Sequence, residues 1–349
     1  MYKKKHNLKT ALVILNWNGD ELLRKYLKTV IAHCRNGFTD VIVADNASTD
    51  GSMHRMKCFF PYVRTIVLDK NYGFAEGYNR ALAQLDGYDY YVLCNSDIML
   101  RSDAVSPVVR KMEGDREIAV AVPKIKSLRQ PEMFEYAGAA GGFIDKYGFP
   151  FCRGRILDTV ERDDGQYDQD SETFWASGAF MVVRAEVYRQ LGGLDSKFFA
   201  HMEEIDFCWR VKNNGLKVAY CHDAEVFHLG GATLNQGSPR KLFLNYRNSL
   251  WMMMKNLPTS CLIFRLWARM VLDGMSAMVY LLRLQPKYFW AVVKAHFAFY
   301  GNLPRLARQR KLSKKPAEKL PSGMLDGSII WQYFVKKRTT FGGIFINKN

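Results

Sequence analysis

Two aspartates, Asp45 and Asp97, each follow a short apolar run of the chain. A carboxylate at the end of a buried strand can accept the N3–H of uracil or thymine, which is a way to select a nucleotide, and this is the chemistry we assign to Asp45. Asp97 is the last residue of the run Asn95-Ser96-Asp97. Mg²⁺ and Mn²⁺ prefer oxygen ligands, which both this carboxylate and a diphosphate could supply. A turn or a helix cap would also place Asp at such positions.

Three further acids, Glu203, Glu204 and Asp206, stand within four residues of one another. Acids at a helix start are stabilised by the helix dipole, so an exposed, capped helix is the simplest interpretation. Because three such carboxylates repel one another, one of them is a candidate general base. His228 follows a predicted strand, 224–227, and a neutral imidazole there can complete a metal shell with Asp97.

The remaining candidates surround these acids in sequence. They are Asn16, Asn71, Gly73, Asn79, Asn95 and Ser96 for a nucleotide, and Trp175 and Gly178 for a second substrate. Gly73 allows close approach of the backbone, although a loop that enters a helix would look the same.

Short apolar runs alternate with helical patterns through the first half of the chain. Strands are predicted at 10–15, 41–44, 65–68, 90–94, 118–122 and 180–183, and helices at 20–32 and 75–85, after 185 and from about 201. This rhythm indicates an α/β fold with a mainly parallel central sheet, whose ligands lie beyond the carboxyl ends of the strands. Residues 128–172 lack periodicity, which predicts loops and short antiparallel pieces.

The charge is distributed unevenly, which predicts two regions, 1–236 and 237–349. The first holds 30 Lys and Arg against 31 Asp and Glu, and the second holds 20 against 3. Seven cysteines without a CxxC pair favour a reducing compartment, and no signal segment is visible at the N-terminus.

The second region predicts a basic, amphipathic helical structure. An apolar stretch, 260–283, carries one stripe of polar side chains: Arg265, Arg269, Asp273, Ser276 and Arg283. Such a stripe is costly inside lipid, so we expect a helix that lies in the membrane interface and does not span it. A basic cluster follows, suited to an anionic membrane surface: Arg305, Arg308, Arg310, Lys311, Lys314, Lys315 and Lys319. The alternative is a helical subdomain with a solvated basic face.

The order and spacing of these motifs resemble the family 2 glycosyltransferases, inverting enzymes of the GT-A fold, and especially their rhamnosyltransferase-like members. The resemblance runs from about residue 8 to about 235 and rests on VILNWNG (13–19), VIVADNASTDGS (41–52), NYGFAEGYN (71–79), YYVLCNSD (90–97), WASGAFMVVR (175–184), FFAHMEEIDFCWR (198–210) and FHLGGAT (227–233).

The resemblance implies a role for each matching residue. Asp45 matches the residue that reads the base, Asp97 the last residue of the metal triplet, and His228 a histidine that reaches the metal or the diphosphate. Glu204 matches the general base, which the family usually has as Asp, so Glu203 or Asp206 could share or take that role. Asn95 stands where the triplet usually has an acid.

The expected reaction is inverting transfer of a sugar from a UDP- or dTDP-sugar, with dTDP-rhamnose as one candidate, to a hydroxyl of a saccharide acceptor. We expect a lipid-linked acceptor, a role in cell-surface polysaccharide synthesis, and a cytoplasmic enzyme held peripherally at the inner face of the membrane, with no nucleic acid as partner. A nucleotidyltransferase and a catalytically inactive membrane-binding module are the alternatives. Residues 16–25 lack the Gly-rich basic loop of a nucleotidyltransferase.

Overall fold

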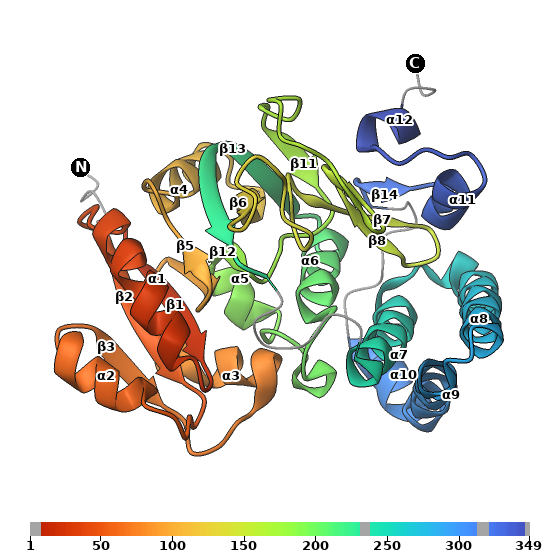
Figure 1. Ribbon diagram of the computed structural model, residues 1–349, viewed down its shortest axis with the longest axis horizontal. Helices are drawn as coiled ribbons and strands as arrows, with labels where there is room; N and C mark the ends of the chain where they lie inside the picture. The colour runs from red at the N-terminus through yellow and green to blue at the C-terminus, as the bar shows by residue number, and fades with distance from the viewer. Residues whose placement is uncertain (1–7, 231–237, 313–320, 346–349) are drawn as a thin grey trace.

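A nine-stranded mixed sheet forms the centre of the protein (Figure 1). The computed structural model describes residues 8–230, 238–312 and 321–345. Four adjacent strands are parallel, in the spatial order β3 (Arg64–Val67), β2 (Thr39–Asp45), β1 (Thr10–Asn16) and β4 (Tyr90–Asn95). They are connected through α1 (Asp20–His33), α2 (Ser52–Phe59) and α3 (Gly73–Leu82).

The other half of the sheet is mixed. It contains β12 (Phe180–Arg184), β6 (Ile118–Ser127), β13 (Lys217–His228), β11 (Ser171–Thr173) and β5 (Ile98–Met99). Strand β12 is antiparallel to both β4 and β6, whereas β6 and β13 are parallel. The associated helices are α4 (Val105–Gly114), α5 (Ala185–Gln190) and α6 (Glu203–Asn213), with a 3₁₀ turn at Ser196–Phe198. The predicted strands are all present, because their apolar runs are buried within the sheet.

The register of the parallel strands brings their carboxyl ends together. Asn16 lies opposite Asp45, and Leu15 lies opposite Asn95. The polar residues that follow β1, β2 and β4 therefore meet at one edge of the sheet, as the sequence predicts.

A second, five-stranded sheet packs beside the first. It has the order β10 (Thr159–Val160), β9 (Arg155–Ile156), β8 (Pro150–Cys152), β7 (Gly142–Asp145) and β14 (Met324–Leu325). The first four strands are the short antiparallel pieces expected within 128–172. Strand β14 comes from the far end of the chain and pairs in parallel with β7. Helices α11 (Ile329–Phe334) and α12 (Phe341–Phe345) follow it.

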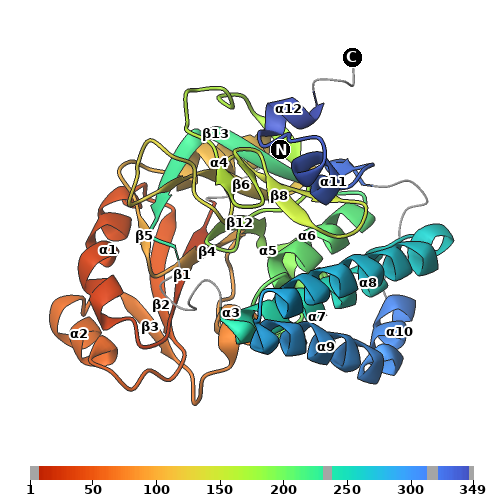
Figure 2. The same cartoon turned by 45° about the vertical axis from the view of Figure 1, so that its right-hand side comes forward.

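Four helices from the basic region form a bundle beside the main sheet (Figures 1 and 2). They are α7 (Pro239–Asn256), α8 (Thr259–Leu282), α9 (Pro286–Gly301) and α10 (Leu303–Leu312). Helix α7 packs against α6 as well as against the other three helices, so it joins the bundle to the sheet.

Helix α8 is amphipathic, and the middle of its polar stripe faces the protein. Arg269 and Asp273 are buried and ion-paired, with Nε 2.7 Å from Oδ1, and Arg269 also donates to the carbonyl oxygens of Tyr147 and Gly148. The Ser276 hydroxyl lies 2.6 Å from that of Tyr246. The middle of the stripe therefore attaches α8 to the rest of the chain, whereas Arg283, at its end, is exposed.

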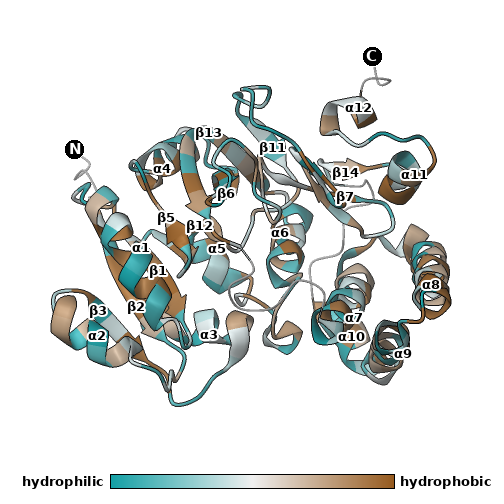
Figure 3. Ribbon diagram, viewed as in Figure 1, coloured by the Kyte–Doolittle hydropathy of each residue, from teal (hydrophilic) through white to brown (hydrophobic). Residues whose placement is uncertain are grey.

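The opposite side of α8, which we call the α8 outer face, is apolar and exposed. Figure 3 colours most of this helix as hydrophobic. The exposed apolar residues are Ile263, Phe264, Trp267, Val271, Met275, Met278, Val279, Leu281 and Leu282. Within the described ranges, no helix combines the length and hydropathy needed to cross a bilayer.

The basic cluster is divided between internal and exposed side chains. Arg310 donates to the carbonyl oxygens of Met254 and Lys255, and Arg305 lies over the Trp251 ring. Arg308 and Lys311 are exposed. The other members, Lys314, Lys315 and Lys319, lie outside the described residues.

Candidate active site

The Asp45 carboxylate is buried at the end of β2 and held by two donors. Asn16 Nδ2 lies 3.0 Å from Oδ1, and the backbone N–H of Ser48 lies 3.0 Å from Oδ2. Each carboxylate oxygen can accept a further hydrogen bond. The orientation of this carboxylate is therefore set by the protein, and it keeps the capacity to bind a nucleobase N–H.

Asn46, which sequence reasoning did not single out, holds the loop beside Asp45. Its Nδ2 donates to Asn71 Oδ1 at 3.1 Å and to the Gly73 carbonyl at 3.0 Å, and its Oδ1 accepts from Tyr72 N–H. The sequence feature that could have identified Asn46 is its position directly after the aspartate at the end of a strand. Asn71 thus contacts the residue that follows Asp45, and its side-chain oxygen also accepts from Gly73 N–H within the loop.

Two residues that the sequence predicts to contact the nucleotide, Asn79 and Gly73, instead make contacts that hold the fold together. Asn79 Oδ1 accepts from the Tyr188 hydroxyl and from Leu194 N–H, and Nδ2 donates to Leu194 O at 2.7 Å. Asn79 therefore anchors the loop before the 3₁₀ turn, and both of its polar atoms are engaged there, contrary to the predicted nucleotide contact. At Gly73, which has φ +76°, an added Cβ would lie 2.7 Å from the Phe199 ring, so the close approach there is to Phe199.

Asp97 and His228 are brought together by the pairing of β5 with β13, in which Ile98 lies opposite His228. His228 Nε2 lies 3.1 Å from Asp97 Oδ1 and 3.4 Å from Asn95 Nδ2. Ser96 lies between Asn95 and Asp97 and faces the turn at Gly19. Asp97 and His228 therefore contact each other, and their role as metal ligands stays a prediction.

Glu135 is a buried acid that the sequence analysis missed. Its Oε1 lies 3.4 Å from His228 Nδ1, so the imidazole stands between two carboxylates. Burial opposes a charge on His228, but Glu135 and Asp97 outweigh it and raise its pKa to about 10. Glu135 lies in the segment without periodicity, where no sequence signal distinguished it from other loop acids.

The acids at the start of α6 differ in their surroundings. A Cβ added at Gly178 would lie 3.8 Å from Glu204 Cβ and 3.0 Å from Phe74 Cζ, so Glu204 borders the Gly178 backbone. Oε2 atoms of both Glu203 and Glu204 have no hydrogen-bond partner among the described residues. Burial raises the pKa of Glu204 to about 7, and burial together with Glu204 raises that of Glu203 well above its ordinary value.

The Asp206 carboxylate, in contrast, is fully buried, and both of its oxygens have hydrogen-bond partners. Its Oδ2 lies 2.8 Å from Lys255 Nζ and 3.0 Å from Arg210 Nε, and its Oδ1 accepts from Asn256 Nδ2 at 2.8 Å. These contacts connect α6 to α7. Of the three acids, only Glu203 and Glu204 have a carboxylate oxygen without a hydrogen-bond partner among the described residues.

A sequence model of glycosyl transferase family 2 matches residues 11–192. The chain belongs to this family. It is therefore a glycosyltransferase, and the nucleotidyltransferase and inactive-module alternatives are set aside. The matched segment includes the strand ends at Asn16, Asp45 and Asp97 and the Gly178 backbone.

Curated relatives of this glycosyltransferase include two rhamnosyltransferases. It is 25% identical over 214 residues to the N-acetylglucosaminyl-diphospho-decaprenol L-rhamnosyltransferase of Mycobacterium tuberculosis, a match that covers 54% of this chain and 66% of that protein. It is 23% identical over 227 residues to rhamnosyltransferase WbbL of Escherichia coli, covering 62% and 82%.

Solved structures confirm the GT-A fold. GalNAc-T7, solved with UDP, GalNAc and Mn²⁺, superimposes with a TM-score of 0.57 at 14% identity, over 72% of this chain and 49% of that one. The expected α/β architecture, with its mainly parallel sheet and C-terminal helices, is therefore confirmed.

The loop that leads into α6 of this glycosyltransferase is held in an unusual conformation. Phe199, His201 and Met202 have φ of 69°, 69° and 71°, in the left-handed region that side chains disfavour. Asn248 Nδ2, from α7, donates to the carbonyl oxygens of Ala200 at 2.9 Å and His201 at 2.7 Å. Helix α7 therefore stabilises the backbone immediately before Glu203.

Trp175 does not line an open site. Its ring is buried, its Nε1 donates to the Phe143 carbonyl at 2.8 Å, and an added Cβ at Gly142 would collide with it. Trp175 thus packs the two sheets together, and its buried side chain is not placed to bind an acceptor, contrary to the prediction. Gly178 remains beside Glu204.

Proposed function

We propose that this enzyme transfers a sugar, with inversion, from a UDP- or dTDP-sugar to a hydroxyl of a lipid-linked saccharide. The observation that carries the proposal is that three sets of candidate residues lie around one edge of the sheet. An oriented carboxylate, Asp45, lies at one strand end, the Asp97–His228 pair at another, and the unpartnered Glu204 carboxylate beside Gly178.

On the donor side, Asp45 would accept the base N–H, with Asn16 hydrogen-bonded to it and Asn71 hydrogen-bonded to the neighbouring Asn46. Asn16 keeps the Asp45 carboxylate in place through a single hydrogen bond. Discrimination by a buried hydrogen-bonding group is strong, because a base that lacks the matching donor leaves it unpaired. Uracil and thymine both have the required N–H.

The Asp97–His228 pair fits a divalent cation. The 3.1 Å between Asp97 Oδ1 and His228 Nε2 suits neighbouring ligands of one metal ion, and both atoms are of types that bind Mg²⁺ or Mn²⁺. Among the described residues no three His, Cys, Asp or Glu form a metal cluster, so the diphosphate would complete the shell. When bound, the ion neutralises charge on the departing diphosphate. His228 must be neutral to be a ligand, so a proton competes with the metal.

On the acceptor side, Glu204 would remove the proton of the attacking hydroxyl. Its raised pKa lies near neutral pH, where a carboxylate is an effective general base. Glu203 is more deeply buried and is the second candidate. Attack from the face opposite the diphosphate inverts the anomeric centre in a single displacement.

We further propose that the enzyme acts in cell-surface polysaccharide synthesis, peripherally at the cytoplasmic face of the membrane. The α8 outer face would enter the interface, and exposed cations such as Arg308 and Lys311 would attract anionic lipid. The similarity to an enzyme named for a diphospho-decaprenol acceptor supports a lipid-linked substrate, and the two rhamnosyltransferases make dTDP-rhamnose the first donor to test.

The test is thermal unfolding across a panel of nucleotide sugars, each with Mn²⁺ or with chelator. A ligand that binds only the native state raises the unfolding temperature. We expect stabilisation by UDP- or dTDP-sugars that requires the metal and is lost in Asp45→Ala. Stabilisation by purine nucleotide sugars alone would refute the assignment of Asp45.

A further inference from the structure

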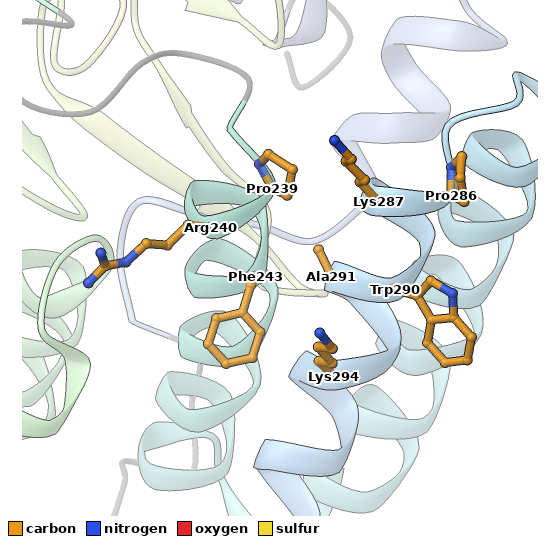
Figure 4. Close-up of a pocket in the computed structure, with 8 residues that line it drawn as sticks. All are labelled: Pro239, Arg240, Phe243, Pro286, Lys287, Trp290, Ala291 and Lys294. Atoms are coloured by element: carbon orange, nitrogen blue, oxygen red, sulfur yellow. The ribbon is translucent and has the colours of Figure 1, made fainter.

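A groove of about 610 Å³ opens between the N-terminal halves of α7 and α9 (Figure 4). It is lined by Pro239, Arg240, Phe243, Pro286, Lys287, Trp290, Ala291 and Lys294. In Figure 4 the Arg240 side chain extends from α7 away from α9, the Trp290 side chain extends from α9 away from α7, and Ala291 lies between the two helices. None of these residues belongs to the site at the sheet edge.

The groove combines positive charge with an apolar lining. Arg240, Lys287 and Lys294 are exposed, and none of the three forms an ion pair with any residue that the structure describes. Neither α7 nor α9 has an acid in its first turn, so the positive ends of two helix dipoles add to these cations. Phe243, Ala291 and Trp290 supply the apolar surface. This composition suits a multiply charged anion that carries a hydrocarbon chain.

A chain of contacts connects the groove to the candidate base. The Arg240 guanidinium lies 5.2 Å from the centre of the Phe199 ring, and Phe199 O accepts from Phe74 N–H at 2.9 Å. The Phe74 ring borders Gly178, which in turn borders Glu204. The Arg240 end of the groove is therefore linked by these contacts to the segment before Glu204.

We propose that this groove binds the diphosphate of the lipid-linked acceptor together with the first units of its hydrocarbon chain. The inference rests on the proposed function and adds the place where the lipid is recognised. Lys287 and Lys294 of α9 supply two unpaired charges, which match a diphosphate better than the single charge of a common anionic phospholipid, while Arg240 extends toward Phe199. Trp290 is 55% exposed, so a chain that lies against it could continue into the membrane interface.

The experiment measures binding of farnesyl diphosphate by calorimetry in the presence of chelator, which removes the metal from the donor site. We expect Lys287→Gln with Lys294→Gln to weaken binding at least about tenfold, in line with the loss of two charged contacts. Lys28→Gln, which removes an exposed charge from α1, should leave it unchanged. Trp290→Ala should weaken farnesyl diphosphate but not inorganic diphosphate.

Three results would overturn the proposal: no binding of farnesyl diphosphate, equal binding by the double variant, or equally tight binding of dihexanoylphosphatidylglycerol. The last would identify a site for membrane headgroups. If the double variant does not unfold cooperatively, Arg240→Gln provides the same comparison. Metal-dependent stabilisation by nucleotide sugars is measured on the same preparations. If this stabilisation is observed while farnesyl diphosphate does not bind as expected, the groove proposal is wrong and the proposed function is not affected.

Discussion

Lys255 of α7 and Asp206 of α6 form a buried ion pair, with Nζ 2.8 Å from Oδ2. The pair joins the basic helical region to the helix that carries the candidate base.

Removing one partner of a buried pair leaves an uncompensated charge, which typically costs about 3–5 kcal/mol. We expect Lys255→Met to lower the free energy of unfolding by about 3 kcal/mol in urea denaturation, because Arg210 and Asn256 still contact Asp206. Lys28→Met is the matched control, and an equal effect of both changes would show that the pair contributes nothing.

Glu204→Gln should lower kcat at least about 10²-fold, the usual loss when a general base is removed. Donor binding, measured by thermal shift, should be retained because Glu204 borders the acceptor side. If Glu204→Gln keeps near-normal turnover while Glu203→Gln abolishes it, the base is Glu203.

The same residue predicts the pH dependence of the reaction. A base accepts a proton only when it is ionised, and burial raises the pKa of Glu204 to about 7. We therefore expect kcat/KM to rise as pH increases through about 7 and then to level off, in initial-rate measurements at constant ionic strength. A profile flat from pH 6 to 8 would contradict this assignment.

Metal removal should abolish transfer, with activity restored by Mg²⁺ or Mn²⁺. Asp97→Ala should weaken metal-dependent donor binding, and His228→Ala should do so to a smaller extent, since Asp97 supplies the charged ligand. Both are measured by titrating Mn²⁺ at fixed donor concentration. Full activity in excess chelator would exclude a metal role for Asp97 and His228.

Association with anionic vesicles should depend on both apolar and charged residues. Phe264 and Trp267 are 66% and 61% exposed on the α8 outer face, and changing both to Ser should reduce vesicle binding at every salt concentration. Arg308→Gln with Lys311→Gln should reduce binding mainly at low salt. Salt screens the attraction between these cations and anionic lipid, and the Debye length is about 8 Å at physiological ionic strength. Vesicle sedimentation separates the two effects.

The charge variants avoid Arg305 and Arg310, whose loss would also disturb the contacts of α10 with α7. Equal binding to neutral and anionic vesicles, independent of salt, would eliminate the electrostatic contribution. Resistance to alkaline carbonate extraction from cell membranes would contradict a peripheral attachment.

Local patterns were sufficient to predict most of the sheet. Apolar runs ending in Asn16, Asp45 and Asn95 predicted buried strands, and the rule that ligands lie beyond strand ends predicted where their polar residues meet. The Asp97–His228 contact was also predictable, because a family resemblance gave both residues a role.

What could not be predicted depends on contacts between distant segments. Glu135 reaches His228 through an aperiodic segment, and Asn248 reaches the Ala200 and His201 carbonyls from another region of the chain. Asn79 and Trp175 appeared suited to ligands because of their types, whereas hydrogen bonds to Leu194 and Phe143 engage them in packing. The amphipathic character of α8 was clear, but sequence cannot indicate which face meets the protein.

The pairing of β14 with β7 also constrains the order of folding. Asp145, at the end of β7, accepts a hydrogen bond from the backbone N–H of Ile329 at 2.9 Å, across 184 positions of chain. During synthesis, the edge of β7 emerges long before its partner strand exists. Contacts of such long range slow folding, and an unpaired edge can recruit other strands in the meantime. The second sheet is therefore the part of the molecule most exposed to misassembly while the chain is being made.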